Sequence, residues 1–172
     1  MAPSKKSPQV ALDTNFILDL AEGDEDCLDC IEELRRVTLA PKLVLTPTVV
    51  EELVHLAKFG EEKESQELAN IALSSILKWG LQPINFIAVG HGIVDRVSEE
   101  IRVKNLLPWE ERHDALIIAE AALCNCDILV TSDQQITGIP HEQLKPLLEG
   151  FHISCPLICW PKMLIKLLSK KA

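Results

Sequence analysis

The sequence predicts an α/β protein of three layers, α/β/α, with helices on both faces of a central, mainly parallel sheet of about five strands. Short apolar segments alternate with helical patterns along the 172 residues, which is typical of a parallel sheet with helical crossovers. Two apolar segments run directly into an aspartate: Asp13 follows Val10-Ala11-Leu12, and Asp133 ends Ile128–Asp133. Ligands bind beyond the carboxyl ends of such strands, so these aspartates mark the expected site.

The length and net charge of the chain limit the classes of function that the protein can have. We expect a single domain over residues 1–172, because this length supports one sizeable core. Residues 1–8 form a polar lead-in rather than a signal peptide, and no apolar run approaches the roughly 20 residues of a membrane span. A cytoplasmic protein without membrane contact is therefore expected. The net charge of −9 argues against nucleic-acid binding through a basic surface, so any such attraction must be local or supplied by metal ions.

Helical periodicity in the first half of the chain predicts several helices around a second strand. Thr46 suits a helix N-cap, and Pro47 suits the first turn that follows. The expected elements are helices at 15–21, 26–38, 47–59 and 61–79, and a strand at 42–46. The apolar face includes Leu28, Ile31 and Leu34 in the second of these helices, and Leu68, Ile71, Ala72, Ser75 and Ile76 in the fourth.

Glycine and proline residues mark the expected boundaries between helices and strands in the second half of the chain. The helix expected over 110–126 is rich in alanine and apolar on most sides, so it should be largely buried. The other expected elements are strands at 83–89, 127–131 and 151–159, a loop at Gly90 and Gly92, and helices at 93–107, at 140–149 and from Pro161 onward.

Six cysteines fall in three close pairs, Cys27/Cys30, Cys124/Cys126 and Cys155/Cys159. Close pairs are typical of zinc sites, but the first pair lies on an expected helix and the spacings do not repeat as in a zinc ribbon or finger. Free cysteines that behave as small buried hydrophobes are favoured over structural zinc. Disulfides are less expected still, because the expected compartment is reducing.

Four acidic residues stand out by position. Asp13 and Asp133 end apolar strands, Asp114 lies near the start of a mostly apolar helix, and Glu52 lies on the helix after the second strand. Carboxylates gathered at one sheet edge raise each other's pKa, and divalent cations such as Mg²⁺ or Mn²⁺, which prefer oxygen ligands, relieve that repulsion. Each acid also has a purely structural explanation. Asp13 and Asp133 could cap helices, the helix dipole could favour Asp114 in a first turn, and Glu52 could be a surface residue.

Four segments around these acids resemble the PIN-domain family of metal-dependent ribonucleases. They are Leu12–Asn15, Pro47–Leu53, His113–Ala119 and Leu129–Asp133, and the resemblance runs from about Gln9 to the last helix. The resemblance implies a PIN-like fold and an acidic quartet of Asp13, Glu52, Asp114 and Asp133. The family's glutamate usually precedes a leucine, which favours Glu52 over Glu51, as does helical spacing with Val49, Leu53 and Leu56.

The chemistry that the resemblance implies is hydrolysis of an RNA phosphodiester with one or two Mg²⁺ or Mn²⁺ ions held by the quartet. An activated water is then the nucleophile, so no serine, cysteine or histidine nucleophile is required. Thr14 and Asn15 would orient Asp13 or the water, and Thr131 matches a hydroxyl that the family often places ahead of its last aspartate. His113 neighbours Asp114 on a helix and should point elsewhere, so His113 and Arg112 are expected at the surface or as substrate contacts.

The resemblance also implies partners. These are an RNA substrate, a protein inhibitor or antitoxin if the chain is the toxin of a toxin–antitoxin pair, and a second copy of the chain in a homodimer. The two helices between Glu52 and Asp114 are longer than in many toxin members, which gives room for a partner or a substrate clamp.

Two other readings compete with a nuclease. The first is a non-catalytic PIN-fold module that binds RNA or protein, which the acidic composition favours. With no tyrosine and few other aromatic residues, no base-stacking platform is evident. The second is a phosphotransfer domain with an aspartyl nucleophile. A haloacid-dehalogenase-like phosphatase would have a second aspartate where Asn15 stands, and a receiver domain would have an acidic pair at the first strand, so the sequence disfavours both.

Overall fold

The computed structural model describes residues 7–38, 40–86 and 88–170, so most of the polar lead-in and Ile87 of the strand expected at 83–89 lie outside the described residues. In chain order the elements are β1 (Gln9–Leu12), α1 (Thr14–Glu22), α2 (Glu25–Val37), β2 (Lys42–Leu45), α3 (Pro47–Phe59), α4 (Lys63–Ser75), β3 (Leu81–Pro83), α5 (Ala88–Val103), α6 (Arg112–Leu123), β4 (Ile128–Val130), α7 (Gln134–Thr137), α8 (His141–Gly150), β5 (Leu157–Cys159) and α9 (Pro161–Ser169).

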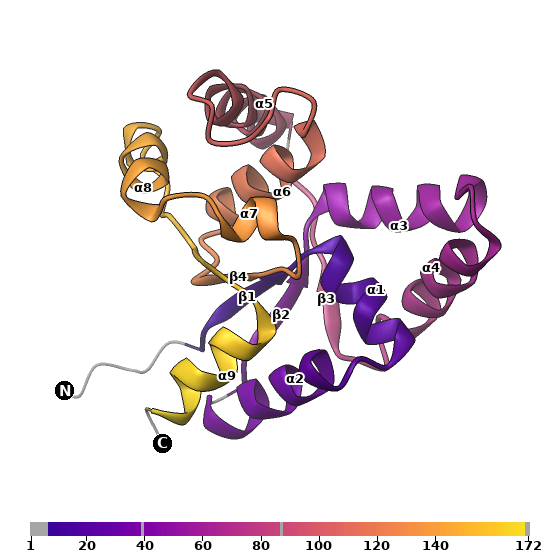
Figure 1. Cartoon of the computed structure of the whole chain (residues 1–172). Helices are drawn as coiled ribbons and strands as arrows, with labels where there is room; N and C mark the ends of the chain where they lie inside the picture. The colour runs from indigo at the N-terminus through magenta and orange to yellow at the C-terminus, as the bar shows by residue number, and fades with distance from the viewer. Residues whose placement is uncertain (1–6, 39, 87, 171–172) are drawn as a thin grey trace.

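Within the described residues, the sheet has five strands in the order β3-β2-β1-β4-β5, all paired in parallel (Figure 1). This confirms the fold class expected from the sequence. β1 lies at the centre, where Ala11 pairs with Val44 on one side and with Leu129 on the other. β2 and β3 follow β1 in sequence and lie on one side of it, whereas β4 and β5 lie on its other side. The strand order therefore reverses between β1 and β4, and a crevice is expected beyond their carboxyl ends.

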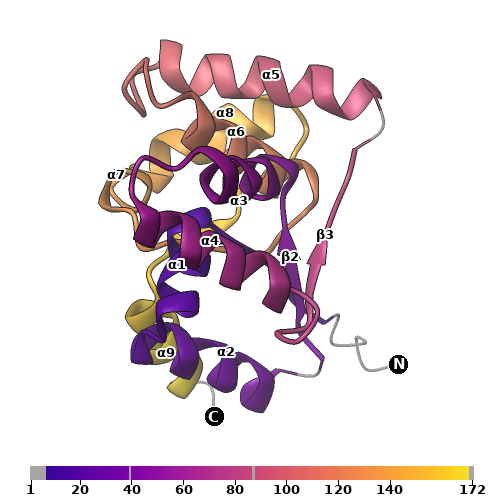
Figure 2. The same ribbon diagram turned by 90° about the vertical axis from the view of Figure 1, so that its right-hand side faces the viewer.

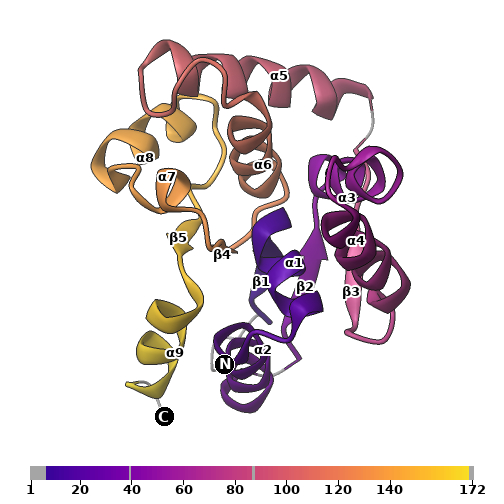
Figure 3. The same cartoon turned by 45° about the vertical axis from the view of Figure 1, so that its right-hand side comes forward.

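Helices cover both faces of the sheet. α1, α2, α4 and α9 lie on one face, and α5, α6, α7 and α8 lie on the other (Figures 1 and 3). Both faces of β1 are buried, since Val10, Ala11 and Leu12, which alternate between the faces, are all inaccessible to solvent. α3 packs against α4 and also against α6, so it joins the two helical layers near the carboxyl edge of the sheet (Figure 2).

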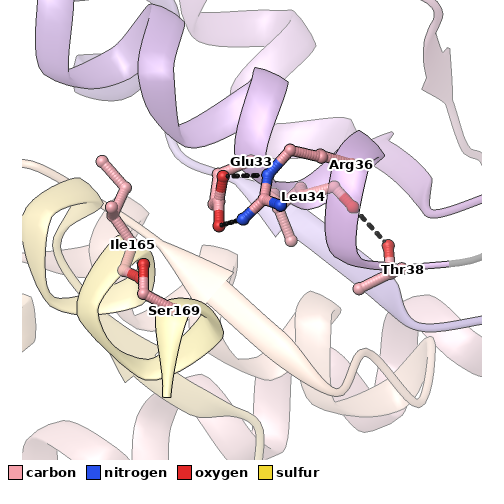
Figure 4. A network of polar contacts seen from close by, with 6 residues as sticks. All are labelled: Glu33, Leu34, Arg36, Thr38, Ile165 and Ser169. Atoms are coloured by element: carbon pink, nitrogen blue, oxygen red, sulfur yellow. Dashed lines mark hydrogen bonds and ion pairs between the residues drawn. The ribbon is translucent and has the colours of Figure 1, made fainter. Parts of the chain in front are cut away.

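α2 and α9 pack together on one face of the sheet (Figure 4). In α2, Arg36 pairs with Glu33 at 2.6 Å, and the Thr38 hydroxyl donates to the Leu34 carbonyl at 2.5 Å. In α9, the Ser169 hydroxyl donates to the Ile165 carbonyl at 2.9 Å. Both hydroxyls thus bond back to the carbonyl four residues earlier, and the Leu34 carbonyl also accepts from the Thr38 backbone N–H at 3.1 Å.

The third strand and the loop after it differ from the sequence expectation. The strand is at Leu81–Pro83 rather than 83–89, because Gly80 adopts a left-handed φ of 65° that turns the chain into its pairing with β2. Gly90 and Gly92 lie inside α5 rather than in a loop. A Cβ at Gly90 would lie 3.1 Å from Cβ of Phe86 and 3.4 Å from Cδ2 of Leu123, so glycine permits the close packing of α5 on α6.

Smaller corrections concern helix faces and lengths. Leu28 and Ile71 are 42% and 46% exposed instead of facing the core, and Cys27 and Cys30 occupy the buried face of α2. α7 was anticipated only through the capping role considered for Asp133, and β5 lies within the segment 151–159 that was expected to hold the last strand. α6 is largely buried, as expected. In the described part of the chain, no helix is both long and apolar enough to cross a membrane.

Candidate functional site

Asp13 stands at the carboxyl end of β1, where it is 2% exposed. Its Oδ2 accepts a hydrogen bond of 2.6 Å from the Thr131 hydroxyl, and its backbone N–H donates to the Val130 carbonyl at 3.0 Å. Asp13 occupies the N-cap position of α1 but makes no side-chain capping bond, so helix capping does not explain it. Its pKa is raised to about 6, chiefly by burial and to a smaller extent by the charges of Glu52 and Asp133, while the hydrogen bonds from Thr131 and the Thr14 backbone oppose the rise.

Asp114 lies in the first turn of α6, half-buried, and it lines the same cavity as Asp13. Burial raises its pKa to about 7, and the negative charges of Asp13, Asp133, Glu111 and Glu52 add to that rise. The first turn of a helix normally favours a carboxylate. Here burial and the neighbouring acids outweigh the helix dipole.

Glu52 comes from the middle of α3 and connects three helices. Its Oε2 accepts a short hydrogen bond from the Thr14 hydroxyl of α1, and its Oε1 lies 3.0 Å from Nδ1 of His113 on α6. Glu51 is exposed, whereas Glu52 is half-buried. The structure therefore places Glu52 deeper than its neighbour, and its contact with His113 was not anticipated.

Asp133 follows β4 and caps α7. Its Oδ1 accepts from the Gln135 backbone N–H at 2.6 Å, and its own backbone N–H donates to Oγ1 of Thr131 at 2.9 Å. Nδ2 of Asn15 lies 3.4 Å from its Oδ2. Asp133 therefore has the structural role considered for it, while its charge still acts on Asp13 and Asp114.

A cavity of about 470 Å³ opens at this edge of the sheet. Its lining contains no lysine or arginine among the described residues. Arg112 is not part of the lining, and its Nη2 lies 3.9 Å from Oδ1 of Asp95. The lining comprises Asp13, Thr14, Asn15, Leu18, Thr48, Glu51, Glu52, His55, Leu56, His113 and Asp114.

The donor set suits a hard divalent cation only in part. In the part of the chain that is described, no group of three or more His, Cys, Asp or Glu side chains is arranged to hold one ion. Mg²⁺, however, commonly keeps several waters and uses only one or two protein carboxylates. Asp13 and Asp114 provide such a pair, and no lysine or arginine of the described lining neutralises them.

Two features of the site were missed at the sequence level. His55 lines the cavity three residues after Glu52, a spacing that places both on one face of α3. Glu120 of α6 is 4% exposed and accepts two hydrogen bonds from Thr48, 3.1 Å from the backbone N–H and 2.8 Å from the hydroxyl. A charged residue within the buried alanine-rich helix was the available signal for Glu120.

Comparisons with known proteins agree with this architecture. The family model described as PIN domain matches residues 10–142, which include all four quartet positions. VapBC2 from Rickettsia felis, crystallised with a DNA fragment from the VapBC2 promoter, is 19% identical with a TM-score of 0.57, over 88% of this chain and 98% of that chain. VapBC-1 from nontypeable Haemophilus influenzae is 23% identical with a TM-score of 0.51, over 76% of this chain and 94% of that chain.

No curated protein sequence matches the chain. The two solved structures, at these identities, are evidence of a shared fold. The family model is evidence from the sequence itself, and its match spans well over half of the chain. The chain belongs to the PIN-domain family.

Proposed function

We propose that this protein is a Mg²⁺- or Mn²⁺-dependent endoribonuclease that hydrolyses RNA phosphodiester bonds. The observation that carries the proposal is the pair Asp13 and Asp114, two carboxylates with raised pKa in a cavity whose described lining has no lysine or arginine. Keeping such groups without a counter-charge is costly for a fold, and a bound cation removes the cost. Membership of the PIN-domain family supports the same reading.

Asp13 and Asp114 would hold the ion directly, and Glu52 and Asp133 would complete the site directly or through water. When bound, one or two such ions polarise the phosphate and promote attack by water. The Thr131 hydroxyl fixes Oδ2 of Asp13, leaving Oδ1 for the ion. Thr14 and His113 hold the two oxygens of Glu52 beside the cavity. Contacts of this kind orient ligands and tune their affinity for metal.

We further propose that the chain is the toxin of a toxin–antitoxin pair, with a protein antitoxin as its inhibitor. The likeness to two VapBC structures supports this role. Co-purification with the product of a neighbouring gene would test it, and recovery of the chain alone from its native source would count against it. The homodimer implied by the family resemblance stays a prediction, which sedimentation equilibrium would test.

A non-catalytic PIN-fold module that binds RNA or protein is the second candidate. One observation favours it: in the described residues, no three side chains of metal-binding type converge on one point. A protein of this kind would bind single-stranded RNA or a partner protein equally well with and without a divalent cation.

Thermal unfolding of chelator-treated protein, with and without millimolar Mn²⁺, separates the two candidates. A nuclease site predicts stabilisation of the wild type by about 2.7 kcal/mol at a hundredfold excess of ion over Kd. Asp13→Asn should lose this gain, whereas Asp29→Asn, an exposed control on α2, should keep it. A metal response in the wild type followed by no cleavage of single-stranded RNA would reject the nuclease.

A further inference from the structure

The cavity has two chemically different ends. It follows α3 from Thr48 to Leu56, which is about 12 Å at the helical rise of 1.5 Å per residue. The end near the sheet carries the carboxylates of Asp13 and Asp114. The far end is lined by Leu18 of α1 and by His55 and Leu56 of α3, so it combines apolar walls with one flat ring.

The His55 ring lies next to the ring of Phe59, four residues later on α3. The ring centroids lie 5.3 Å apart at an interplanar angle of 47°. Pairs four residues apart commonly stabilise a helix, but Phe59 remains 68% exposed, so the pair buries little apolar surface. The pair places two rings next to each other at the rim of the cavity. Histidine is one of the side chains on which splayed RNA bases stack.

We propose that the end of the cavity formed by Leu18, His55 and Leu56 is a nucleobase-binding subsite for single-stranded RNA, in which one base stacks on His55. The proposal rests on the proposed RNA-cleaving function. If the scissile phosphate lies beside Asp13 and Asp114, the nucleoside attached to it occupies the rest of the same cavity.

Charge favours a base over a phosphate at this end. The described lining contains no lysine or arginine that could pair with a phosphate, and the carboxylates of Glu51 and Glu52 on α3 repel one. An uncharged aromatic base needs no cationic partner and is not repelled by these carboxylates. It would also contact the side chains of Leu18 and Leu56. The sequence contains no tyrosine, so its composition did not indicate a surface on which a base could stack. In this subsite the His55 ring would provide that surface.

Uncharged ribonucleosides test the subsite without any dependence on metal or catalysis. Adenosine and cytidine, titrated to millimolar concentration into metal-free protein, should shift the methyl NMR signals of Leu18 and Leu56 in a saturable manner. His55→Ala should abolish these shifts, and His55→Phe should retain them because a flat ring remains. Leu77→Ala, at an apolar residue that is 87% exposed, is the matched control and should bind as the wild type does. Equal binding by His55→Ala, or no saturable shift, overturns the proposal.

Kinetics provide the second readout. His55→Ala should raise KM for a single-stranded RNA by about 5- to 100-fold, the loss expected for one stacked base, with kcat and the Mn²⁺-dependent rise in Tm unchanged. Cleavage with an unchanged KM in His55→Ala would refute the subsite and leave the nuclease standing. Saturable nucleoside binding in a protein that never cleaves RNA would refute the nuclease and support the subsite in a binding module.

Discussion

Helix α6 carries two acidic residues, Asp114 and Glu120, in opposite environments. Glu120 is almost completely buried, yet its carboxylate accepts two hydrogen bonds from Thr48 at the start of α3. Asp114 is only half-buried, yet it faces the charges of Asp13, Asp133, Glu111 and Glu52. Burial raises the pKa of both carboxyl groups. What differs is the supply of hydrogen-bond donors.

The comparison shows that burial alone does not identify a functional carboxylate. Glu120 joins α6 to α3, and each of these helices supplies one member of the acidic quartet. Its bonds to Thr48 satisfy the first turn of α3, where backbone N–H groups lack intrahelical partners. Asp13 accepts one such bond, from the Thr131 hydroxyl, but Asp13 and Asp114 also face each other's charge, and that repulsion is relieved only by protonation or by a cation. The following experiments test this contrast.

Asp13→Asn should have the largest effect. We expect RNA cleavage to fall by at least about a hundredfold, since loss of even a residue that supports a metal ligand costs 10- to 100-fold. Without metal, the variant should unfold at the same urea concentration as the wild type or a higher one, because a buried charge is removed and its oxygen can still accept from Thr131. Cleavage rates and urea unfolding in chelator check the two parts. A marked loss of metal-free stability would instead assign Asp13 the structural role that we give to Glu120.

Glu120→Ala should show the reverse pattern. It leaves the buried N–H and hydroxyl of Thr48 without their acceptor, and we expect the free energy of unfolding to fall by about 2 kcal/mol. Glu120→Gln should lose less, because its amide oxygen still accepts. Glu32→Ala, an exposed acid on α2, is the control and should change little. Unchanged stability of Glu120→Ala in urea unfolding would remove the distinction between the two acids of α6.

The stability of the metal-free protein should depend on pH through Asp13 and Asp114. Their pKa values rise from an ordinary 3.8 to about 6 and about 7, so between these limits the folded state binds more protons than the unfolded state. Their contribution to stability is complete below pH 4 and is lost as pH rises through 6 and 7. These shifts correspond to a loss of up to about 5 kcal/mol between pH 4.5 and 7.5 in chelator.

Urea unfolding across this range measures the slope. Asp13→Asn should flatten it, and millimolar Mn²⁺ should counteract the loss most strongly at pH 7.5, where its carboxylate ligands are ionised. Equal slopes for the wild type and Asp13→Asn would show that Asp13 is not the titrating group.

His113→Ala should have the smallest effect. His113 is largely exposed and contacts Glu52 at the surface of the cavity, where such pairs contribute up to about 1 kcal/mol. We expect the Mn²⁺ affinity, measured by calorimetry, to change by less than about fivefold. A larger loss would mean that His113 belongs to the metal site itself, so that it would count with Asp114 rather than as a supporting contact.

Parts of the fold could be predicted from the sequence because, in those parts, the local preferences of the residues agree with the tertiary structure. Pro47 begins α3, and the apolar segments before Asp13 and Thr131 form β1 and β4, as expected. The strand expected at 83–89 was wrong because an apolar run does not reveal where an edge strand finds its partner, and β3 is defined by pairing with β2. Gly90 and Gly92 suggested a loop, but the packing of α5 on α6 outweighs the roughly 1 kcal/mol by which glycine disfavours a helix.

The sequence by itself determined the α/β class, the parallel sheet, and the positions of Asp13 and Asp133 after strands, of Asp114 near the start of a helix and of Glu52 within one, because periodicity and turn chemistry are local. Only the tertiary structure decided which donors each carboxylate meets. Thr131 contacts Asp13 across 118 positions of sequence, and Thr48 contacts Glu120 across 72. Contacts over such separations depend on how β1 and β4 pair and how α3 packs on α6. Those contacts give Glu120 two hydrogen bonds from Thr48 and Asp13 one from the Thr131 hydroxyl.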